Sequence, residues 1–184
     1  MEGTSRSVES QEPDQVLVEA ARAGDRAAFG RLYRRYARMV HGLLLAQVPA
    51  VDAEDLLHDV FVRAMGKLGA LRDGGAFGPW VASIARHRAT DHHRSRVAVA
   101  RADIEIARHA GAAADVEAHA VLAEICELPL PYRETLVLRL VEGMTGPEIA
   151  ERTGLTPESV RVNLHRGMKK LRERLAPART GDLP

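Results

Sequence analysis

The sequence predicts an all-helical protein of two small domains joined by a linker, with a helix-turn-helix in the second domain. Apolar residues make up 46% of the 184 residues but aromatic residues only 4%, a balance typical of small helical domains packed on Leu, Val and Ala. Apolar residues recur at helical spacing in most segments, and no segment shows a convincing β alternation. An alanine-rich stretch of weak periodicity, residues 97–114, separates the two groups of helical segments.

The first predicted domain covers residues 14–96, after a polar tail at residues 1–13 that is expected to be disordered. Asp14, Asp25 and Asp52 are each placed to cap a helix. The helix after Asp25 carries the longest amphipathic stripe, formed by Phe29, Leu32, Tyr36, Met39, Val40 and Leu43.

A glycine-rich loop at residues 69–78 follows the third predicted helix and leads into a fourth. That helix has Pro79 near its first turn and Trp80 on its inward face. Trp80 is expected in the core rather than as a platform on which a base stacks. The rest of the surface of this helix is rich in arginine. Residues 61–100 together carry seven Lys or Arg against two Asp or Glu. Solvated helix faces are the plain alternative to a binding role for such a patch.

Residues 97–114 are interpreted as a linker, with one further packed helix as the alternative. The second domain is predicted at residues 115–176, followed by a short loose tail at residues 177–184. Its first helix ends before two prolines, and its second is expected to bury Leu136, Val137, Leu140 and Val141.

The stretch "TGPEIAERTGLTPESVRVNLHRGMKKL" begins at residue 145 and reads as two helices joined at Gly154. Thr145 with Glu148 fits a capping box. Thr156 followed by Pro157 fits the start of the second helix. The buried stripe of that helix is predicted to contain Val160, Leu164, Met168, Leu171 and Leu175.

The opposite face of this second helix is cationic and carries one residue that is hard to explain in water. Val162 is apolar and β-branched, and it fits contact with a thymine methyl in the major groove. This pattern favours a helix-turn-helix that inserts its second helix into DNA; a basic solvated helix pair is the alternative. The face is formed by Glu158, Val162, His165, Arg166 and Lys169, flanked by Arg161 and Lys170.

Composition excludes several other classes of protein. The single cysteine, Cys126, cannot form an internal disulfide and is expected to be a small buried hydrophobe; a reactive or metal-binding thiol is the alternative. Neither a signal core nor a membrane-length apolar stretch is present, so we expect a cytoplasmic protein without membrane insertion. Among His87, His92 and His93, the adjacent pair would point about 100° apart on a helix, so no metal site is expected.

Four segments taken in order resemble the extracytoplasmic-function sigma factors, which are small bacterial transcription initiation factors. They are "FGRLYRRYARMVHGLL", "DAEDLLHDVFVRAM", "FGPWVASIARHRATDHHRSR" and "LPLPYRETLVLRLVEGMTGPEIAERTGLTPESVRVNLHRGMKKLRERL". The resemblance covers residues 14–96 and 118–175. It implies a protein that is not an enzyme and needs no cofactor. Its implied partners are core RNA polymerase (the β′ coiled coil and the β flap), promoter DNA and an anti-sigma factor.

The resemblance also implies roles for individual residues of the first domain. Contacts with polymerase are implied for Asp55, His58, Asp59 and Arg63; His58 and Asp59 stand where the family often has Gln and Glu. The loop residues implied to hold the minus-ten element are Asp73, Ala76 and Phe77. On the helix that follows, the residues implied to contact minus-ten DNA are Arg86, His87, Arg88, Arg94 and Arg96, with His87 standing where the family often has Asn.

In the second domain, the resemblance implies that the outer face reads the minus-thirty-five element in double-stranded form. Contacts at this element are implied for Glu158, Ser159, Arg161, Val162, His165 and Arg166, with Lys169 and Lys170 on phosphates. Two other functions remain open. One is a stand-alone helix-turn-helix regulator that binds a palindromic duplex as a dimer. The other is an adaptor that binds polymerase or another partner without reading DNA.

Overall fold

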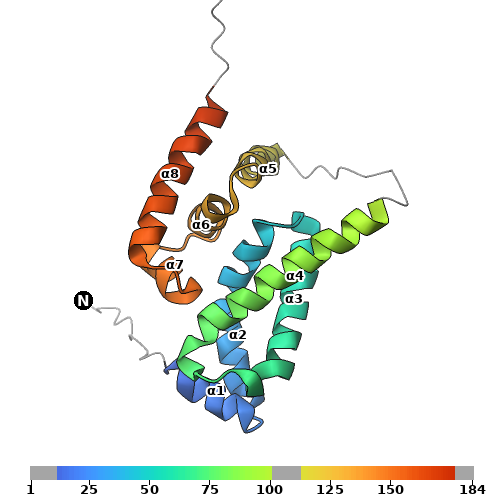
Figure 1. Cartoon of the computed structure of the whole chain (residues 1–184), viewed down its shortest axis with the longest axis vertical. Coiled ribbons are helices and arrows are strands. Elements are labelled where there is room, and N and C mark those ends of the chain that lie inside the picture. Colours follow the sequence, from blue (N-terminus) through green and yellow to red (C-terminus); the bar gives the residue numbers. More distant parts are fainter. Residues whose placement is uncertain (1–11, 101–112, 177–184) are drawn as a thin grey trace, which may run out of the picture.

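Helices are the regular elements throughout the residues that the computed structural model describes, 12–100 and 113–176, with side chains described for 12–95 and 120–176. The prediction of an all-helical chain is confirmed for these residues. Figure 1 shows the helices in two groups, α1 to α4 and α5 to α8, which lie against one another.

The first group is built around α2 (Arg26–Leu45), which packs against its three neighbours. These are α1 (Asp14–Arg22), α3 (Ala50–Lys67) and α4 (Phe77–Ala100). Two short 3-10 turns, η1 (Leu68–Ala70) and η2 (Gly74–Ala76), connect α3 to α4. The predicted stripe of α2 is confirmed: Phe29 is partly buried against the core, and the other five members are buried.

The predicted helix starts are confirmed at one aspartate and corrected at two. The Asp25 carboxylate accepts the backbone N–H groups of Ala27 and Ala28, at 2.8 and 3.1 Å, so it caps α2 as predicted. Asp14 and Asp52 do not cap, because α1 and α3 begin directly after prolines. Both carboxylates lie in the first turn, where they still complement the helix dipole.

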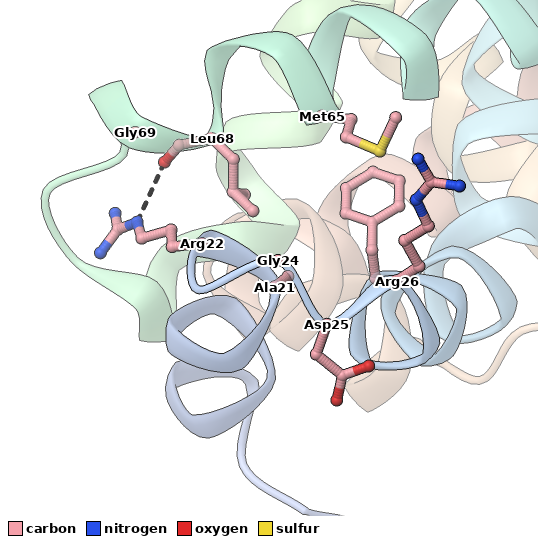
Figure 2. A pocket seen from close by; sticks show the side chains of 9 residues that line it. Ala21, Arg22, Gly24, Asp25, Arg26, Met65, Leu68 and Gly69 are labelled. Carbon is pink, nitrogen blue, oxygen red and sulfur yellow. Dashed lines mark hydrogen bonds between the residues drawn. The ribbon is translucent and has the colours of Figure 1, made fainter.

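The end of α3 is tied to α1 by a single arginine (Figure 2). Nε of Arg22 donates to the carbonyl of Leu68 at 3.2 Å, and its Nη2 donates to the carbonyl of Leu71. A hollow of about 430 Å³ lies beside this contact, between the α1–α2 turn and the last turn of α3. These bonds fix where the chain leaves α3 and therefore where α4 begins.

The second group contains α5 (Ala113–Cys126), α6 (Leu130–Leu140), α7 (Gly146–Thr153) and α8 (Pro157–Leu175). The predicted helix-turn-helix is confirmed. Thr145 and Glu148 form the capping box. Gly154 ends α7 with φ +76°, a conformation that L side chains rarely adopt, and Thr156 caps α8 through the N–H of Ser159.

Three apolar residues predicted to be inward are exposed: Leu140, Val141 and Leu175, each with nearly half of its surface accessible. Instead α6 buries five consecutive residues, from Glu134 to Leu138. This helix is enclosed on two sides, by α8 and by α2, so a single amphipathic stripe does not describe it.

The predicted linker overlaps two helices at its ends. Residues 97–100 continue α4, residues 113–114 begin α5, and residues 101–112 lie outside the described residues. The two predicted tails lie outside them as well, except residues 12–13. No helix in the described part of the chain has the length and apolar character that crossing a membrane requires.

Candidate nucleic-acid interface

The second helix of the helix-turn-helix presents its cationic face to solvent, as predicted. Glu158, Ser159, Arg161, His165, Arg166, Lys169 and Lys170 are exposed, and Val162 is half-buried among them. Four of these residues surround a hollow of about 290 Å³ on the N-terminal half of α8: Arg161, Val162, His165 and Arg166. The structure therefore brings the predicted base-facing residues together on one accessible surface.

One of these cations is held in place by its own helix. Nη2 and Nε of Arg161 donate to the two carboxylate oxygens of Glu158, at 2.6 and 3.2 Å. This contact with Glu158 raises the pKa of Arg161, so the guanidinium stays charged. The pair orients the planar donor group at the end of the helix that a helix-turn-helix inserts first.

The residues predicted to contact minus-ten DNA include some that are held in ion pairs and some that are exposed. Arg86 and Arg88 are turned inward into ion pairs, Arg86 with Glu134 of α6 and Arg88 with Asp59 of α3. Arg94 and His87 are exposed. Arg96 lies in α4, but its side chain is outside the described residues. Of the four predicted contacts whose side chains are described, two are therefore held in ion pairs within the protein.

The loop before α4 also differs from the expectation at one residue. Phe77 is 0% exposed, and its ring centroid lies 5.3 Å from that of Tyr36 and 5.8 Å from that of Trp80. As the first residue of α4 it points into the core, so its ring is not available to hold a base here. Asp73 is exposed and accepts the N–H of Gly75 at 2.9 Å, and Ala76 is half-buried. Trp80 packs against the core, as expected.

The predicted polymerase face of α3 is exposed at three of its four residues. Asp55, His58 and Arg63 face solvent. Asp59 is turned toward α4, where its carboxylate accepts from Arg88, and it also accepts from Nε of Arg63 at 3.1 Å. Asp59 therefore joins α3 to α4 rather than standing free on the outer face.

Known proteins match most of the chain. Residues 32–98 match the protein family described as Sigma-70 region 2, and residues 118–171 match Sigma-70, region 4. RNA polymerase sigma factor CarQ of Myxococcus xanthus is 34% identical, over 86% of this chain and 95% of that protein. The RNA polymerase sigma-H factor of Pseudomonas aeruginosa is 30% identical, over 91% and 96% respectively. The chain belongs to the extracytoplasmic-function family of RNA polymerase sigma factors.

A solved sigma-factor structure has a similar fold. It contains CnrH in complex with the cytosolic domain of CnrY. The match covers 91% of this chain and 100% of the matched chain in that structure, with 27% identity and a TM-score of 0.65. Members of this family are transcription initiation factors. In this sigma factor, region 2 corresponds to α2 through α4, and region 4 to α5 through α8.

Two residues that the sequence analysis did not single out lie where regions 2 and 4 meet. Glu134 and Glu142 are both buried, although both are carboxylates. Glu134 accepts from Arg86, and Oε1 of Glu142 lies 2.7 Å from Nδ1 of His41 in α2. The apolar pattern of α6 gave no signal for Glu134, because it did not predict that five consecutive residues, 134–138, would be buried.

Proposed function

We propose that this sigma factor binds core RNA polymerase and directs it to promoters that carry matching minus-ten and minus-thirty-five elements. It supplies promoter recognition, while the polymerase supplies the chemistry, so the factor itself is not an enzyme and needs no cofactor. Its site of action is the cytoplasm, where bacterial polymerase and promoter DNA are found.

The outer face of α8 is the observation that carries this proposal. After the turn at Gly154 and the capped start at Thr156, α8 brings four residues around one hollow: Arg161, Val162, His165 and Arg166. Arginine can donate two hydrogen bonds to guanine, and an apolar side chain beside it suits a thymine methyl. Lys169 and Lys170, two turns further along and exposed, suit the flanking phosphates.

Region 2 supplies the second half of the proposal. Asp55, His58 and Arg63 form an exposed charged face on α3, which we assign to the β′ coiled coil of polymerase. On α4, the exposed Arg94 and His87 and the arginines that are now paired form the minus-ten surface. Region 4 is assigned to the β flap. Promoter contacts at two separate elements then require regions 2 and 4 to act together on one polymerase.

An anti-sigma protein is the proposed regulator. CnrH, which is similar to 91% of this chain, is solved in complex with the cytosolic domain of CnrY. We propose that an anti-sigma protein also binds this sigma factor, on the same surfaces that polymerase and promoter use.

Run-off transcription with purified core polymerase on a library of candidate promoters tests the proposal. We expect transcripts that depend on both the factor and the promoter sequence, and copurification of the factor with core. A stand-alone regulator would instead bind a palindromic duplex tightly without polymerase. An adaptor that does not read DNA would show no salt-dependent DNA affinity. Failure to copurify with core or to direct promoter-dependent transcription overturns the proposal.

A further inference from the structure

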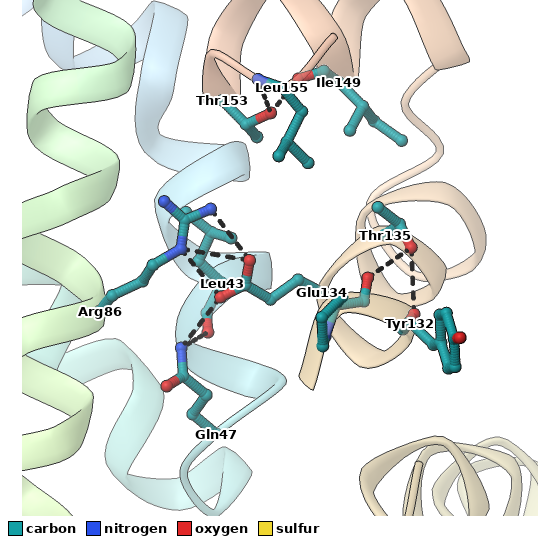
Figure 3. A network of polar contacts seen from close by, with 10 residues as sticks. Leu43, Gln47, Arg86, Tyr132, Glu134, Thr135, Ile149, Thr153 and Leu155 are labelled. Atoms are coloured by element: carbon teal, nitrogen blue, oxygen red, sulfur yellow. Dashed lines mark hydrogen bonds and ion pairs between the residues drawn. The ribbon is translucent and has the colours of Figure 1, made fainter. Parts of the chain in front are cut away.

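A bidentate ion pair connects region 4 to the minus-ten helix of region 2 (Figure 3). Nε of Arg86 lies 3.0 Å from Oε1 of Glu134, and Nη2 of Arg86 lies 2.9 Å from Oε2. Nε2 of Gln47 approaches Oε1 as well, at 3.4 Å. The Glu134 carboxylate thus receives donors from α4 and from the turn after α2 at once.

Burial makes this pair sensitive to any change of partner. The Glu134 side chain is only 8% exposed, and that of Arg86 is 32% exposed. A carboxylate so far from water loses hydration that its partner must replace, and removing one member leaves an uncompensated buried charge. Because Arg86 and Gln47 both belong to the first group of helices, separation of the two regions would take both partners away from Glu134.

The rest of the interface contains apolar packing, such as Leu138 against Gly42, together with hydrogen bonds to backbone carbonyls. Arg133 donates to the carbonyl of Ala46 at 3.2 Å, and Arg152 to the carbonyl of Arg35 at 3.1 Å. Interfaces between domains of one chain generally resemble transient protein contacts, for which relative motion is the normal expectation. Buried ion pairs add orientation more reliably than net stability.

We propose that Glu134 is an autoinhibitory side chain that occupies Arg86 in the free protein, so that Glu134 and the phosphates of minus-ten DNA compete for the same guanidinium. The competition follows from chemistry: the planar guanidinium presents one fork of donors, which fits a carboxylate or a phosphate but cannot serve both fully. DNA binding by α4 through Arg86 therefore requires regions 2 and 4 to separate at α6. Arg94 and His87 are exposed and stay accessible in both states.

The DNA part of this inference rests on the proposed function, whereas the closure itself can be measured without DNA. We would place a fluorescent donor and acceptor on the full chain at Lys67→Cys and Glu173→Cys, both exposed positions, in a Cys126→Ser background. Glu134→Gln keeps the shape of the side chain and removes its charge. We expect it to change the energy transfer from the wild-type value to that of a more open chain.

Glu127→Gln is the matched control, because Glu127 is exposed and its substitution changes the net charge equally. It should leave the energy transfer at the wild-type value. The double variant Arg86→Glu with Glu134→Arg reverses both charges and should restore closure. Restored closure in the double variant would also show that the effect of the single variant is not caused by misfolding. If Glu134→Gln keeps the wild-type energy transfer, the chain stays closed and the proposal is overturned.

Competition for Arg86 is tested with a labelled oligothymidylate at low salt, which reports phosphate contacts without needing a promoter consensus. Apparent affinity rises with the fraction of chain that can bind, and we expect Glu134→Gln to bind about three- to tenfold more tightly. The gain should vanish in an Arg86→Ala background and be absent for Glu127→Gln and for the charge swap. Equal affinity of Glu134→Gln and wild type, including no binding by either, overturns the proposal.

The two proposals fail in different ways. Absence of promoter-dependent transcription by the wild type with core polymerase would overturn the proposed function, while the energy-transfer comparison would still report closure. If the wild type transcribes normally while Glu134→Gln has the energy transfer and the DNA affinity of the wild type, only the autoinhibitory role is overturned.

Discussion

Nδ1 of His41 in α2 lies 2.7 Å from Oε1 of Glu142, in the segment between α6 and α7. This second charged contact joins regions 2 and 4 on the side of α2, separate from the Arg86–Glu134 pair. Glu142 is held further by Arg38, which donates to its carbonyl and lies 3.9 Å from its carboxylate. Because a histidine takes part, closure of the two regions should depend on pH.

The hydrogen bond to Glu142 raises the pKa of His41 above its ordinary value of 6.5, with a smaller contribution from Glu54 of α3, against the lowering effect of burial. A group whose pKa is raised in the closed form stabilises that form while it is protonated. The contribution is therefore complete below pH 6.5 and is lost as the pH rises through the raised pKa.

We expect energy transfer between the labels on regions 2 and 4 to shift toward the open value as the pH rises above 6.5 and through the raised pKa of His41. His41→Gln should remove most of this pH dependence. His87→Gln, which changes an exposed histidine bonded to a carbonyl of its own helix, should keep it. An equal pH dependence in wild type and His41→Gln would contradict the assignment.

A glycine sets how closely α2 and region 4 approach. A Cβ on Gly42 would lie 2.8 Å from both Cγ of Glu142 and Cδ2 of Leu138, which is too close without movement. Gly42→Ala should therefore open the interface, although alanine favours the helix by about 1 kcal/mol over glycine. Gly30→Ala on the same helix is the control, because the nearest atom to its Cβ would be a flexible arginine Nη1 at 3.7 Å.

Two measurements separate these effects. Thermal unfolding followed by circular dichroism should show that Gly30→Ala stabilises α2. Energy transfer should show opening for Gly42→Ala alone. Opening by both substitutions to the same extent, or by neither, would mean that Gly42 does not control the approach.

Local sequence rules predicted the features that depend on neighbours along the chain. The capping box at Thr145, the end of α7 at Gly154 and the start of α8 at Thr156 each follow from the chemistry of a few adjacent residues, and all three are confirmed. The outer face of α8 was predictable for a similar reason, because one helix with one buried stripe determines which residues are left outside.

Features that depend on two packed regions were not predictable in this way. Leu140 and Val141 follow the apolar pattern of α6, yet they are exposed because the covering by α2 and α8 falls on residues 134–138. Arg86 looks like a free surface cation until Glu134, 48 residues away, is placed beside it. Periodicity within one helix carries no information about charges supplied by another.

The two aspartates of α3 should behave differently when they are neutralised. Asp55 is exposed, whereas Asp59 accepts from Arg88 and Arg63. Asp55→Asn should change the free energy of unfolding by no more than about 0.5 kcal/mol. It should nevertheless weaken binding to core polymerase, by about three- to tenfold if the residue contacts the β′ coiled coil.

Unlike Asp55→Asn, Asp59→Asn should lower the free energy of unfolding, by about 1 kcal/mol, because it removes a partly buried ion pair between α3 and α4. Chemical denaturation and a fluorescence titration against core polymerase measure the two quantities on the same samples. If Asp55→Asn left polymerase affinity unchanged while Asp59→Asn reduced both quantities, the contact surface would have to be moved away from Asp55.

Arg166 and Lys169 test whether the face of α8 separates base reading from phosphate binding. Arg166 borders the hollow beside Val162, whereas Lys169 lies nearly one turn further along the exposed face. Arg166→Ala should lose about 1–3 kcal/mol of discrimination between the matched and a scrambled minus-thirty-five element. Lys169→Ala should weaken binding to both sequences alike and reduce the dependence of log K on log salt by about one phosphate contact. Electrophoretic competition between the two duplexes at several salt concentrations measures both effects, and equal losses on matched and scrambled DNA for both variants would show that Arg166 does not read a base.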